Sequence, residues 1–220
     1  MSCEGASRLV TLELAGPVGP LEALLQECES GRPSCAALVC HPHPLYGGTM
    51  QNKVVQRVAA TLHDLGGTTL RFNFRGAGRS AGRFAQGGGE LEDARAALAW
   101  LRSRLSGTSL LVAGFSFGAW VAARLAAAEA DVDRLVLVAP PVEQSSFAAL
   151  HAATVPKLVL QGTSDDVCPL GTLEAEYAAW AEPKQLIRVD GATHFFDRQL
   201  GELAKALRQG LATLPRGRTS

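Results

Sequence analysis

The stretch LLVAGFSFG at residues 110–118 decides the fold. Its first four residues form an unbroken apolar run, which is typical of a strand buried on both faces of a sheet. Residues 117–128 are apolar nearly all round and are interrupted only by Arg124, so we expect a buried helix there. The G-x-S-x-G pattern between the two predicts a sharp turn from strand to helix, with Ser116 in the turn.

Strands and helices alternate along the rest of the chain. Apolar runs predict further central strands at 36–40, 69–74, 135–139 and 158–160, and another strand precedes residue 190 at 185–189. Helical segments are expected between them, over 51–65, 90–105, 173–181 and 198–214. This alternation predicts an α/β fold, in which helices cover both faces of a mostly parallel, twisted sheet.

The ends of the chain extend this arrangement. Two alternating stretches, 9–14 and 21–25, predict half-buried strands joined by a turn rich in glycine and proline. No linker-like stretch interrupts the pattern, so we expect a single domain over 1–214 and a loose tail over 215–220. Only residues 140–156 separate two central strands at the point where a cap could be inserted. We therefore expect no cap domain and an open, shallow site.

Composition excludes several classes of protein. Apolar residues make up 47% of the 220 residues and charged residues 19%, which is unlike a disordered chain. Lys plus Arg and Asp plus Glu are 21 each, so the neutral chain has no electrostatic footprint for nucleic acid or an anionic membrane. The five cysteines, an odd number without a C-x-x-C pair, indicate neither a disulfide framework nor a zinc ribbon. With no signal peptide or membrane span in the sequence, we expect a cytoplasmic protein.

Ser116 is the candidate nucleophile. A sharp turn strains the backbone of the serine, and glycine at 114 and 118 removes side chains that would collide with neighbouring elements. The helix that starts at the serine favours negative charge developing there. The alternative is an ordinary glycine-rich loop in which Ser116 caps the helix.

A serine nucleophile needs a base, and the base needs an acid to orient it. Asp165 and Asp166 follow the strand at 158–160, and His194 follows the strand at 185–189. In enzymes whose nucleophilic serine lies in a strand-to-helix turn, the three residues occur along the chain in this same order: serine, aspartate, histidine. The alternative for His194 is a capping or surface histidine.

The loop HPHPLYGGT at 41–49 is the candidate partner for an oxyanion, which needs two converging backbone N–H groups. One should belong to Phe117, the residue after the candidate nucleophile. Proline has no N–H, so residues 42 and 44 are excluded. His43 is favoured for the second donor, with Leu45 or Tyr46 as alternatives.

Taken together, the chain resembles an α/β-hydrolase, and within that superfamily the small bacterial type without a cap. The resemblance lies in HPHPLYGGTMQNKVV at 41–55, RFNFRGAGRSAG at 71–82, GFSFG at 114–118, GTSDDVCP at 162–169 and GATHFF at 191–196. It implies Ser116 as nucleophile, His194 as base and Asp165 as acid, because the first aspartate of the G-x-x-D-x-x-V-P pattern is the catalytic one. Cys168 stands where that pattern has valine.

The expected reaction is hydrolysis of a small carboxylic ester through an acyl-enzyme, with a small acyl compound as the substrate. A thioesterase or peptidase with the same triad is the alternative, and so is a binding protein without activity. No cofactor or metal is expected, and the sequence does not indicate an oligomeric state.

Three further features invite rival interpretations. The loop at 75–82 has the spacing G-x-G-x-x-x-G, which does not match the dinucleotide fingerprint, although Arg75 or Arg79 in it could meet a substrate carboxylate. His41 and His43 beside Cys40 lack further ligands nearby for a metal. Trp120 and Trp180 fall in predicted helices, where packing explains them more readily than ligand contact.

Overall fold

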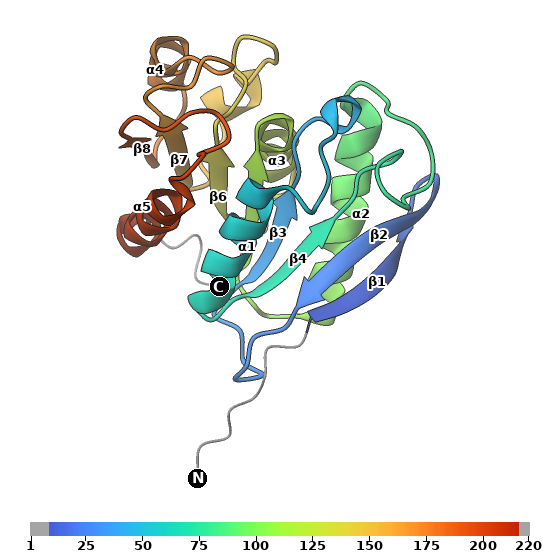
Figure 1. Ribbon diagram of the computed structural model, residues 1–220. Helices are drawn as coiled ribbons and strands as arrows, with labels where there is room; N and C mark the ends of the chain where they lie inside the picture. Colours follow the sequence, from blue (N-terminus) through green and yellow to red (C-terminus); the bar gives the residue numbers. More distant parts are fainter. Residues whose placement is uncertain (1–8, 216–220) are drawn as a thin grey trace.

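The computed structural model describes residues 9–215 and contains one eight-stranded sheet in the order β1-β2-β4-β3-β5-β6-β7-β8 (Figure 1). The strands are β1 (Leu9–Gly16), β2 (Gly19–Gln26), β3 (Ala36–Cys40), β4 (Thr68–Phe72), β5 (Leu110–Phe115), β6 (Val132–Val138), β7 (Lys157–Gly162) and β8 (Lys184–Val189). All pairs within the run β4-β3-β5-β6-β7-β8 are parallel, whereas β1 pairs antiparallel with β2 and β2 antiparallel with β4. The predicted α/β fold with a mostly parallel sheet is confirmed.

Helices cover both faces of this sheet. They are α1 (Lys53–Asp64), α2 (Gly88–Arg104), α3 (Phe117–Ala128), α4 (Leu170–Ala178) and α5 (Leu200–Thr213), with short 3₁₀ helices η1 (Pro44–Tyr46) and η2 (Ala148–His151). Helices α1 and α5 pack on one face, in front of the sheet in Figure 1, and α2 and α3 pack on the other.

A hydrophobic core lies on each face of the sheet, because side chains alternate between the two faces along the buried strands. In β5, Leu110 and Val112 face α2 and α3, whereas Leu111, Ala113 and Phe115 face α1 and α5. Because both faces are covered, every residue of β5 is buried. The central strands can therefore be apolar throughout, which is the pattern that made them recognisable in the sequence.

Several element boundaries differ from the predictions. The predicted helix at 198–214 begins at Leu200, because Phe196 and Arg198 have positive φ angles of 50° and 61° and cannot be helical. The predicted helix at 173–181 covers Leu170–Ala178 instead, since Pro169 provides its N-cap and it ends before Trp180. The predicted strand at 69–74 covers Thr68–Phe72.

The segment between β6 and β7 is short. Residues 139–156 contain only η2, in agreement with the predicted absence of a cap. No helix within residues 9–215 is long and apolar enough to cross a membrane. Of the predicted tail at 215–220, only Pro215 lies within the described residues.

Candidate active site

Ser116 lies in a strained turn between β5 and α3. Its φ and ψ are 55° and −124°, a backbone conformation that residues with a side chain rarely adopt. A Cβ atom at Gly114 would lie 2.1 Å from the carbonyl oxygen of Gly118, and one at Gly118 would lie 2.4 Å from that of Cys40. Both glycines are therefore required by close approach of the backbone, as the G-x-S-x-G pattern predicts.

Three loops bring Ser116, His194 and Asp165 into one hydrogen-bonded chain. The Nδ1 atom of His194 lies 2.9 Å from Oδ2 of Asp165, and its Nε2 atom lies 3.1 Å from Oγ of Ser116. A carboxylate only accepts, so Nδ1 carries the proton and Nε2 accepts from the serine hydroxyl when the ring is neutral. His194 is only 4% exposed, which excludes the alternative of a surface histidine.

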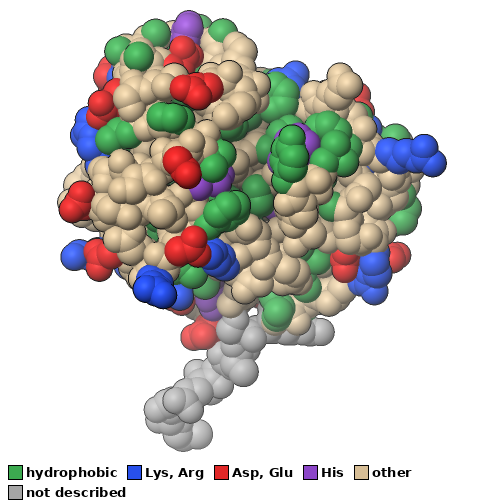
Figure 2. All heavy atoms as spheres, turned by 45° about the horizontal axis from the view of Figure 1, so that its top comes forward, with side chains coloured by type: hydrophobic (Ala, Val, Ile, Leu, Met, Phe, Trp, Pro, Cys, Tyr) green, Lys and Arg blue, Asp and Glu red, His purple; other side chains and the backbone are tan. Residues whose placement is uncertain are grey.

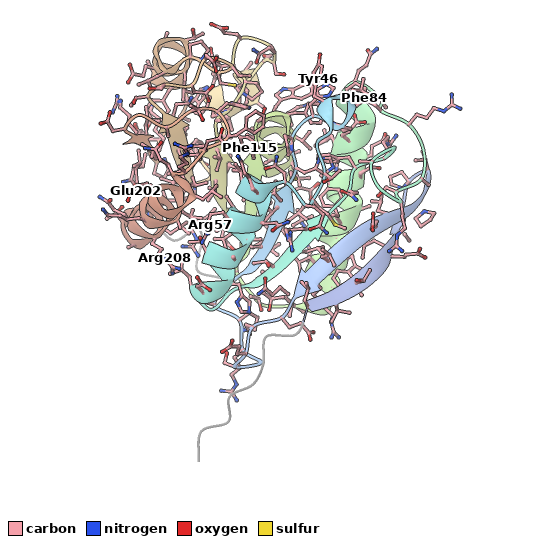
Figure 3. The ribbon with its side chains drawn as sticks, viewed as in Figure 1. Tyr46, Arg57, Phe84, Phe115, Glu202 and Arg208 are labelled. Carbon is pink, nitrogen blue, oxygen red and sulfur yellow. The ribbon has the colours of Figure 1, made fainter. Side chains whose placement is uncertain are left out.

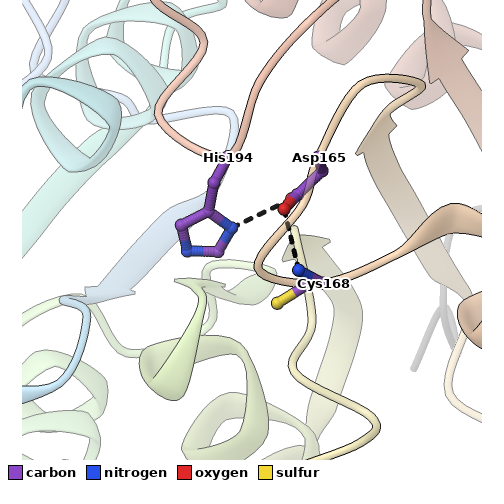
Figure 4. Close-up of side chains that lie close together, drawn as sticks. All are labelled: Asp165, Cys168 and His194. Atoms are coloured by element: carbon purple, nitrogen blue, oxygen red, sulfur yellow. Dashed lines mark hydrogen bonds and ion pairs between the residues drawn. The ribbon is translucent and has the colours of Figure 1, made fainter.

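Asp165 is held by four donors, of which Figure 4 shows His194 and the N–H of Cys168. Its Oδ1 accepts from the N–H groups of Val167 and Cys168, at 3.0 and 2.8 Å. Its Oδ2 accepts from the side-chain amide of Gln161 at 3.0 Å, besides His194. These bonds fix the carboxylate in the orientation that meets the imidazole. The neighbouring Asp166 is exposed instead. Of the two aspartates, Asp165, which the resemblance implied as the acid, is therefore the one that contacts His194.

Asp165, Cys168 and His194 also form a group whose potential ligand atoms lie within 4.8 Å of one another. Burial raises the pKa of the Cys168 thiol, and the charges of Asp165 and Glu143 raise it further. The thiolate that a metal ion prefers is therefore disfavoured. Both carboxylate oxygens and both ring nitrogens are already hydrogen bonded, so the group suits a proton relay better than a metal.

The candidate donors for an oxyanion differ in their availability. The N–H of Leu45 donates to Nδ1 of His43 at 3.2 Å, and that of Tyr46 donates to the His43 carbonyl at 3.1 Å. The N–H of His43 itself has no acceptor among the described residues. Phe117 is the first residue of α3, where an N–H has no acceptor inside the helix. The N–H groups of His43 and Phe117 thus have no acceptor among the described residues, and both residues line the same cavity as Ser116.

A cavity of about 530 Å³ opens beside Ser116. Its walls come from the loops after β3, β4, β5, β6 and β7 and from α3. They comprise His43, Tyr46, Phe84, Gln86, Ser116, Phe117, Trp120, Pro141, Gln144, Ser145 and Val167. Tyr46 and Phe84 lie close to each other at the upper end of the molecule, where the central strands finish (Figure 3). Binding sites of parallel sheets lie at that end of the strands.

Two exposed apolar side chains, Tyr46 and Val167, line this cavity, and each of Leu45 and Phe195 is the chain neighbour of a residue at the site. Leu45 is 68% exposed, Tyr46 87%, and Val167 and Phe195 are 44% exposed each. They come from the loops after β3, β7 and β8, and hydrophobic side chains and histidine gather on this face of the molecule (Figure 2). The loops around Ser116 therefore expose apolar surface.

The loop at 75–82 has an internal structural role. Arg75 is buried, and its guanidinium donates to the buried carboxylate of Asp93 at 2.7 Å. The Nε atom of Arg79 donates to Glu22 at 3.1 Å. The suggestion that Arg75 meets a substrate carboxylate is thus wrong, because its partner Asp93 is inside the protein. Arg79 pairs with Glu22 and is not among the residues that line the cavity beside Ser116.

His41 also has a structural role. Its Nδ1 donates to the carbonyl oxygen of Pro42 at 2.6 Å, and its Nε2 accepts from the N–H of Phe74 at 2.9 Å. Burial lowers the pKa of His41 to about 4, so the ring is neutral near pH 7. With both nitrogens used, His41 links the loop after β3 to the loop after β4 and is not free to bind a metal.

Several residues of this site were not singled out by the sequence. Gln161, which donates to Asp165, lies one residue before the end of the buried strand β7 and belongs to no motif. Trp120, which we attributed to packing, lines the cavity. Trp180 does pack in the core, but it lies beyond the end of α4 and stacks on Phe147. Phe84 follows a glycine-rich loop, so only contacts between loops reveal its place.

Comparison with known proteins agrees with this geometry. The family described as serine aminopeptidase, S33, matches residues 37–149. An α/β serine hydrolase homologue from Coxiella burnetii is 41% identical, with a TM-score of 0.88, over 92% of this chain and 97% of that one. An α/β serine hydrolase without lid from Xanthomonas campestris is 38% identical, with a TM-score of 0.88, over 97% of each chain.

A relative without an assigned activity, an uncharacterized protein of Rickettsia prowazekii, is 37% identical over 90% of this chain and 87% of its own length. These similarities extend over nearly the whole sheet and its helices, and they include the elements that carry Ser116, Asp165 and His194. The chain therefore belongs to the α/β-hydrolase superfamily, among its serine hydrolases without a lid.

Proposed function

We propose that this serine hydrolase cleaves small carboxylic esters through an acyl-enzyme intermediate. The observation that carries the proposal is the continuous chain from Ser116 Oγ through His194 to Asp165, with distances of 3.1 and 2.9 Å. A serine hydroxyl is a weak nucleophile alone, and an oriented imidazole that accepts its proton activates it.

In the first half of the reaction, Nε2 of His194 takes the proton of Ser116 while Oγ attacks the ester carbonyl. Asp165 accepts from Nδ1–H and stabilises the imidazolium that forms. The N–H groups of Phe117 and His43 donate to the oxyanion. Nε2 then gives its proton to the departing alkoxide, which leaves as an alcohol while the acyl group stays on Oγ.

In the second half, a water molecule replaces the alcohol. Nε2 takes a proton from this water, whose oxygen attacks the acyl carbon. Collapse of the second oxyanion breaks the bond to Oγ, and the proton on Nε2 returns to Ser116. The carboxylic acid leaves, and no cofactor or metal takes part in any of these steps.

An ester is favoured over a peptide by the charge of the cavity. An aminopeptidase has to bind the ammonium group at the start of its substrate, for which a carboxylate is the expected partner. None of the side chains that line the cavity beside Ser116 is acidic. A thioester with the same acyl group remains the alternative, since its recognition needs no additional charge.

Active-site labelling tests the proposal directly. The folded protein is incubated with a fluorophosphonate, its intact mass is measured, and the modified peptide is mapped. We expect one adduct per chain, on Ser116, and none in Ser116→Ala. The control is Ser103→Ala, which removes an exposed hydroxyl of α2 and should still be labelled. No adduct, or an adduct on another residue, would contradict the proposal.

The bond type is then determined with one acyl group in three linkages. Butyrate is offered as an oxygen ester, a thioester and an anilide, and kcat/KM is measured for each. We expect the oxygen ester to have the highest value. A higher value for the thioester or the anilide would replace the esterase by a thioesterase or an amidase that uses the same residues.

A further inference from the structure

We propose that the cavity beside Ser116 selects substrates that carry a flat, uncharged aromatic group. This inference rests on the proposed esterase function and adds to it the class of substrate. It comes from five rings that line the cavity, His43, Tyr46, Phe84, Phe117 and Trp120, which we call the aromatic wall.

The rings of the aromatic wall contact one another. His43 lies at its centre, with ring centroids 4.8 Å from Tyr46, 4.6 Å from Phe84 and 4.9 Å from Phe117. Phe117 lies 5.8 Å from Phe84 and 5.7 Å from Trp120. All these pairs are tilted, which is a favourable arrangement for aromatic rings, so the five side chains form one continuous surface.

Trp120 is held in place from three sides. Its indole N–H donates to the carbonyl oxygen of Ser146 at 2.9 Å, and the Arg124 guanidinium lies 4.9 Å from the centre of its ring. On another side is Gly87, where a Cβ atom would lie 2.0 Å from the indole. The indole is therefore oriented before any ligand binds.

Phe84 is held through the backbone of its own loop. Glu90 is fully buried, and its carboxylate accepts the N–H groups of Ala85 at 2.8 Å and Gly87 at 2.7 Å. Arg124 also donates to the Gly87 carbonyl oxygen at 3.2 Å. These contacts join the loop that carries Phe84 to the helix that carries Trp120. A wall fixed in this way loses little conformational freedom when a rigid group binds.

The cavity excludes charge. No Lys, Arg, Asp or Glu is among its lining residues. Besides His43, its polar side chains are the neutral amides and hydroxyls of Gln86, Gln144, Tyr46, Ser116 and Ser145. Burial lowers the pKa of His43, so its ring is neutral near pH 7. A charged group that entered the cavity would lose its hydration and find no opposite charge there, which is unfavourable. The volume of the cavity, about 530 Å³, is typical of sites for small molecules.

An aromatic group gains more from this wall than an aliphatic group of similar size. Both bury apolar surface, but only a ring can also pair edge to face with the rings of the wall. Pairing of that kind corresponds to a preference of about 3- to 10-fold. This difference distinguishes an aromatic site from a merely apolar one.

The test compares esters that differ in one ring. Ethyl 3-phenylpropanoate, ethyl 3-cyclohexylpropanoate and ethyl 3-(4-carboxyphenyl)propanoate vary the acyl group, and benzyl, cyclohexylmethyl and 4-carboxybenzyl acetates vary the alcohol. In at least one series, we expect kcat/KM to be about 3- to 10-fold higher for the phenyl compound than for the cyclohexyl one. The carboxylated compound should be at least 10-fold worse than the phenyl one.

Variants assign the preference to the aromatic wall. Phe84→Leu and Trp120→Leu should bring the ratio of phenyl to cyclohexyl substrate close to one. Trp100→Leu is the matched control, because Trp100 is a half-buried tryptophan of α2 outside the cavity, and it should keep the wild-type ratio. As a measurement on unchanged protein, 2-phenylethylboronic acid should slow fluorophosphonate labelling at lower concentration than 2-cyclohexylethylboronic acid.

The outcomes separate this inference from the proposed function. Labelling of Ser116 with equal rates for phenyl and cyclohexyl esters in both series would overturn the aromatic site alone. Preference for the carboxylated esters would do the same. Where the phenyl preference lies in the acyl series, equal potency of the two boronic acids would also overturn it. Absence of labelling would overturn both, since no acyl-enzyme would form.

Discussion

The two sides of the site are built in different ways. On the reactive side, Ser116, His194, Asp165 and Gln161 are positioned by directed hydrogen bonds of 2.9 to 3.1 Å. On the opposite side, the aromatic wall is positioned by ring contacts and by a buried carboxylate that fixes the backbone behind it.

The comparison teaches that the proposed reaction and the recognition of substrate can depend on different side chains, although the backbone N–H groups of His43 and Phe117 in the wall are also the proposed oxyanion donors. The reactive side uses the loops after β5, β7 and β8, whereas most of the aromatic wall comes from the loops after β3 and β4 and from α3. Changes on the reactive side should therefore act on kcat, and changes on the wall should act on the choice of substrate and on stability. The four predictions that follow challenge this division.

Removal of the nucleophile should have the largest effect. Ser116→Ala deletes the atom that the proposed mechanism acylates, so we expect kcat to fall by roughly 10⁶. Hydrolysis of p-nitrophenyl acetate or butyrate by both proteins measures the loss, with Ser103→Ala as the control. Residual activity close to that of the wild type would place the reaction elsewhere.

Loss of the charge on Asp165 should have the next largest effect. Asp165→Asn keeps the size of the side chain but favours the wrong tautomer of His194, so we expect kcat to fall by about 10⁴. Asp166→Asn is the matched control because its carboxyl is exposed one residue away, and it should retain wild-type kcat. Equal losses in the two variants would refute the assignment of Asp165.

Acid should weaken the loops that support the aromatic wall. The pKa of His41 is about 4 in the folded protein against 6.5 for an ordinary histidine, so the unfolded chain binds more protons between these values. Its contribution is complete above pH 6.5 and is lost as the pH falls toward 4, by about 3 kcal/mol in the free energy of unfolding.

Urea unfolding of wild type and His41→Gln between pH 4 and 7 measures this contribution. We expect the free energy of unfolding to fall less steeply with acid in the variant, which lacks the buried imidazole. Parallel curves for the two proteins would show that the burial of His41 has no part in the acid sensitivity.

Gln161→Leu should have the smallest effect of the four. The leucine keeps a similar volume but cannot donate to Oδ2 of Asp165, and a hydrogen bond to a charged group contributes about 1.5–3 kcal/mol. We expect kcat to fall about tenfold with KM little changed, because the amide orients the acid without touching substrate. A rise in KM at constant kcat would place Gln161 on the recognition side and break the division.

Much of the fold was accessible from the sequence because the sheet is buried on both faces. Strand β3 and helix α3 have the predicted bounds, since uninterrupted apolar runs and flanking glycine leave few alternatives. Boundaries set by a single backbone angle, such as that at Arg198, could not be predicted, because nothing in the residue type indicates a positive φ.

The two sides of the site were unequally predictable. Ser116 and His194 each follow a strand within a short motif, so local sequence was enough to select them. The choice of Asp165 over Asp166 came from the family resemblance, and the structure places Asp165 in contact with His194 and His194 in contact with Ser116. Trp120, Phe84 and Gln161 acquire their positions from contacts between loops far apart in the chain. The partner of Arg75, a buried aspartate on α2, was likewise invisible in its own loop.

The short segment between β6 and β7 has a kinetic consequence. With only η2 in residues 139–156, nothing of the size of a hinged flap is available there to be displaced by an oil–water boundary. Velocity should therefore follow a plain saturation curve in dissolved monomer, without an upward jump when the ester passes its solubility limit and forms droplets.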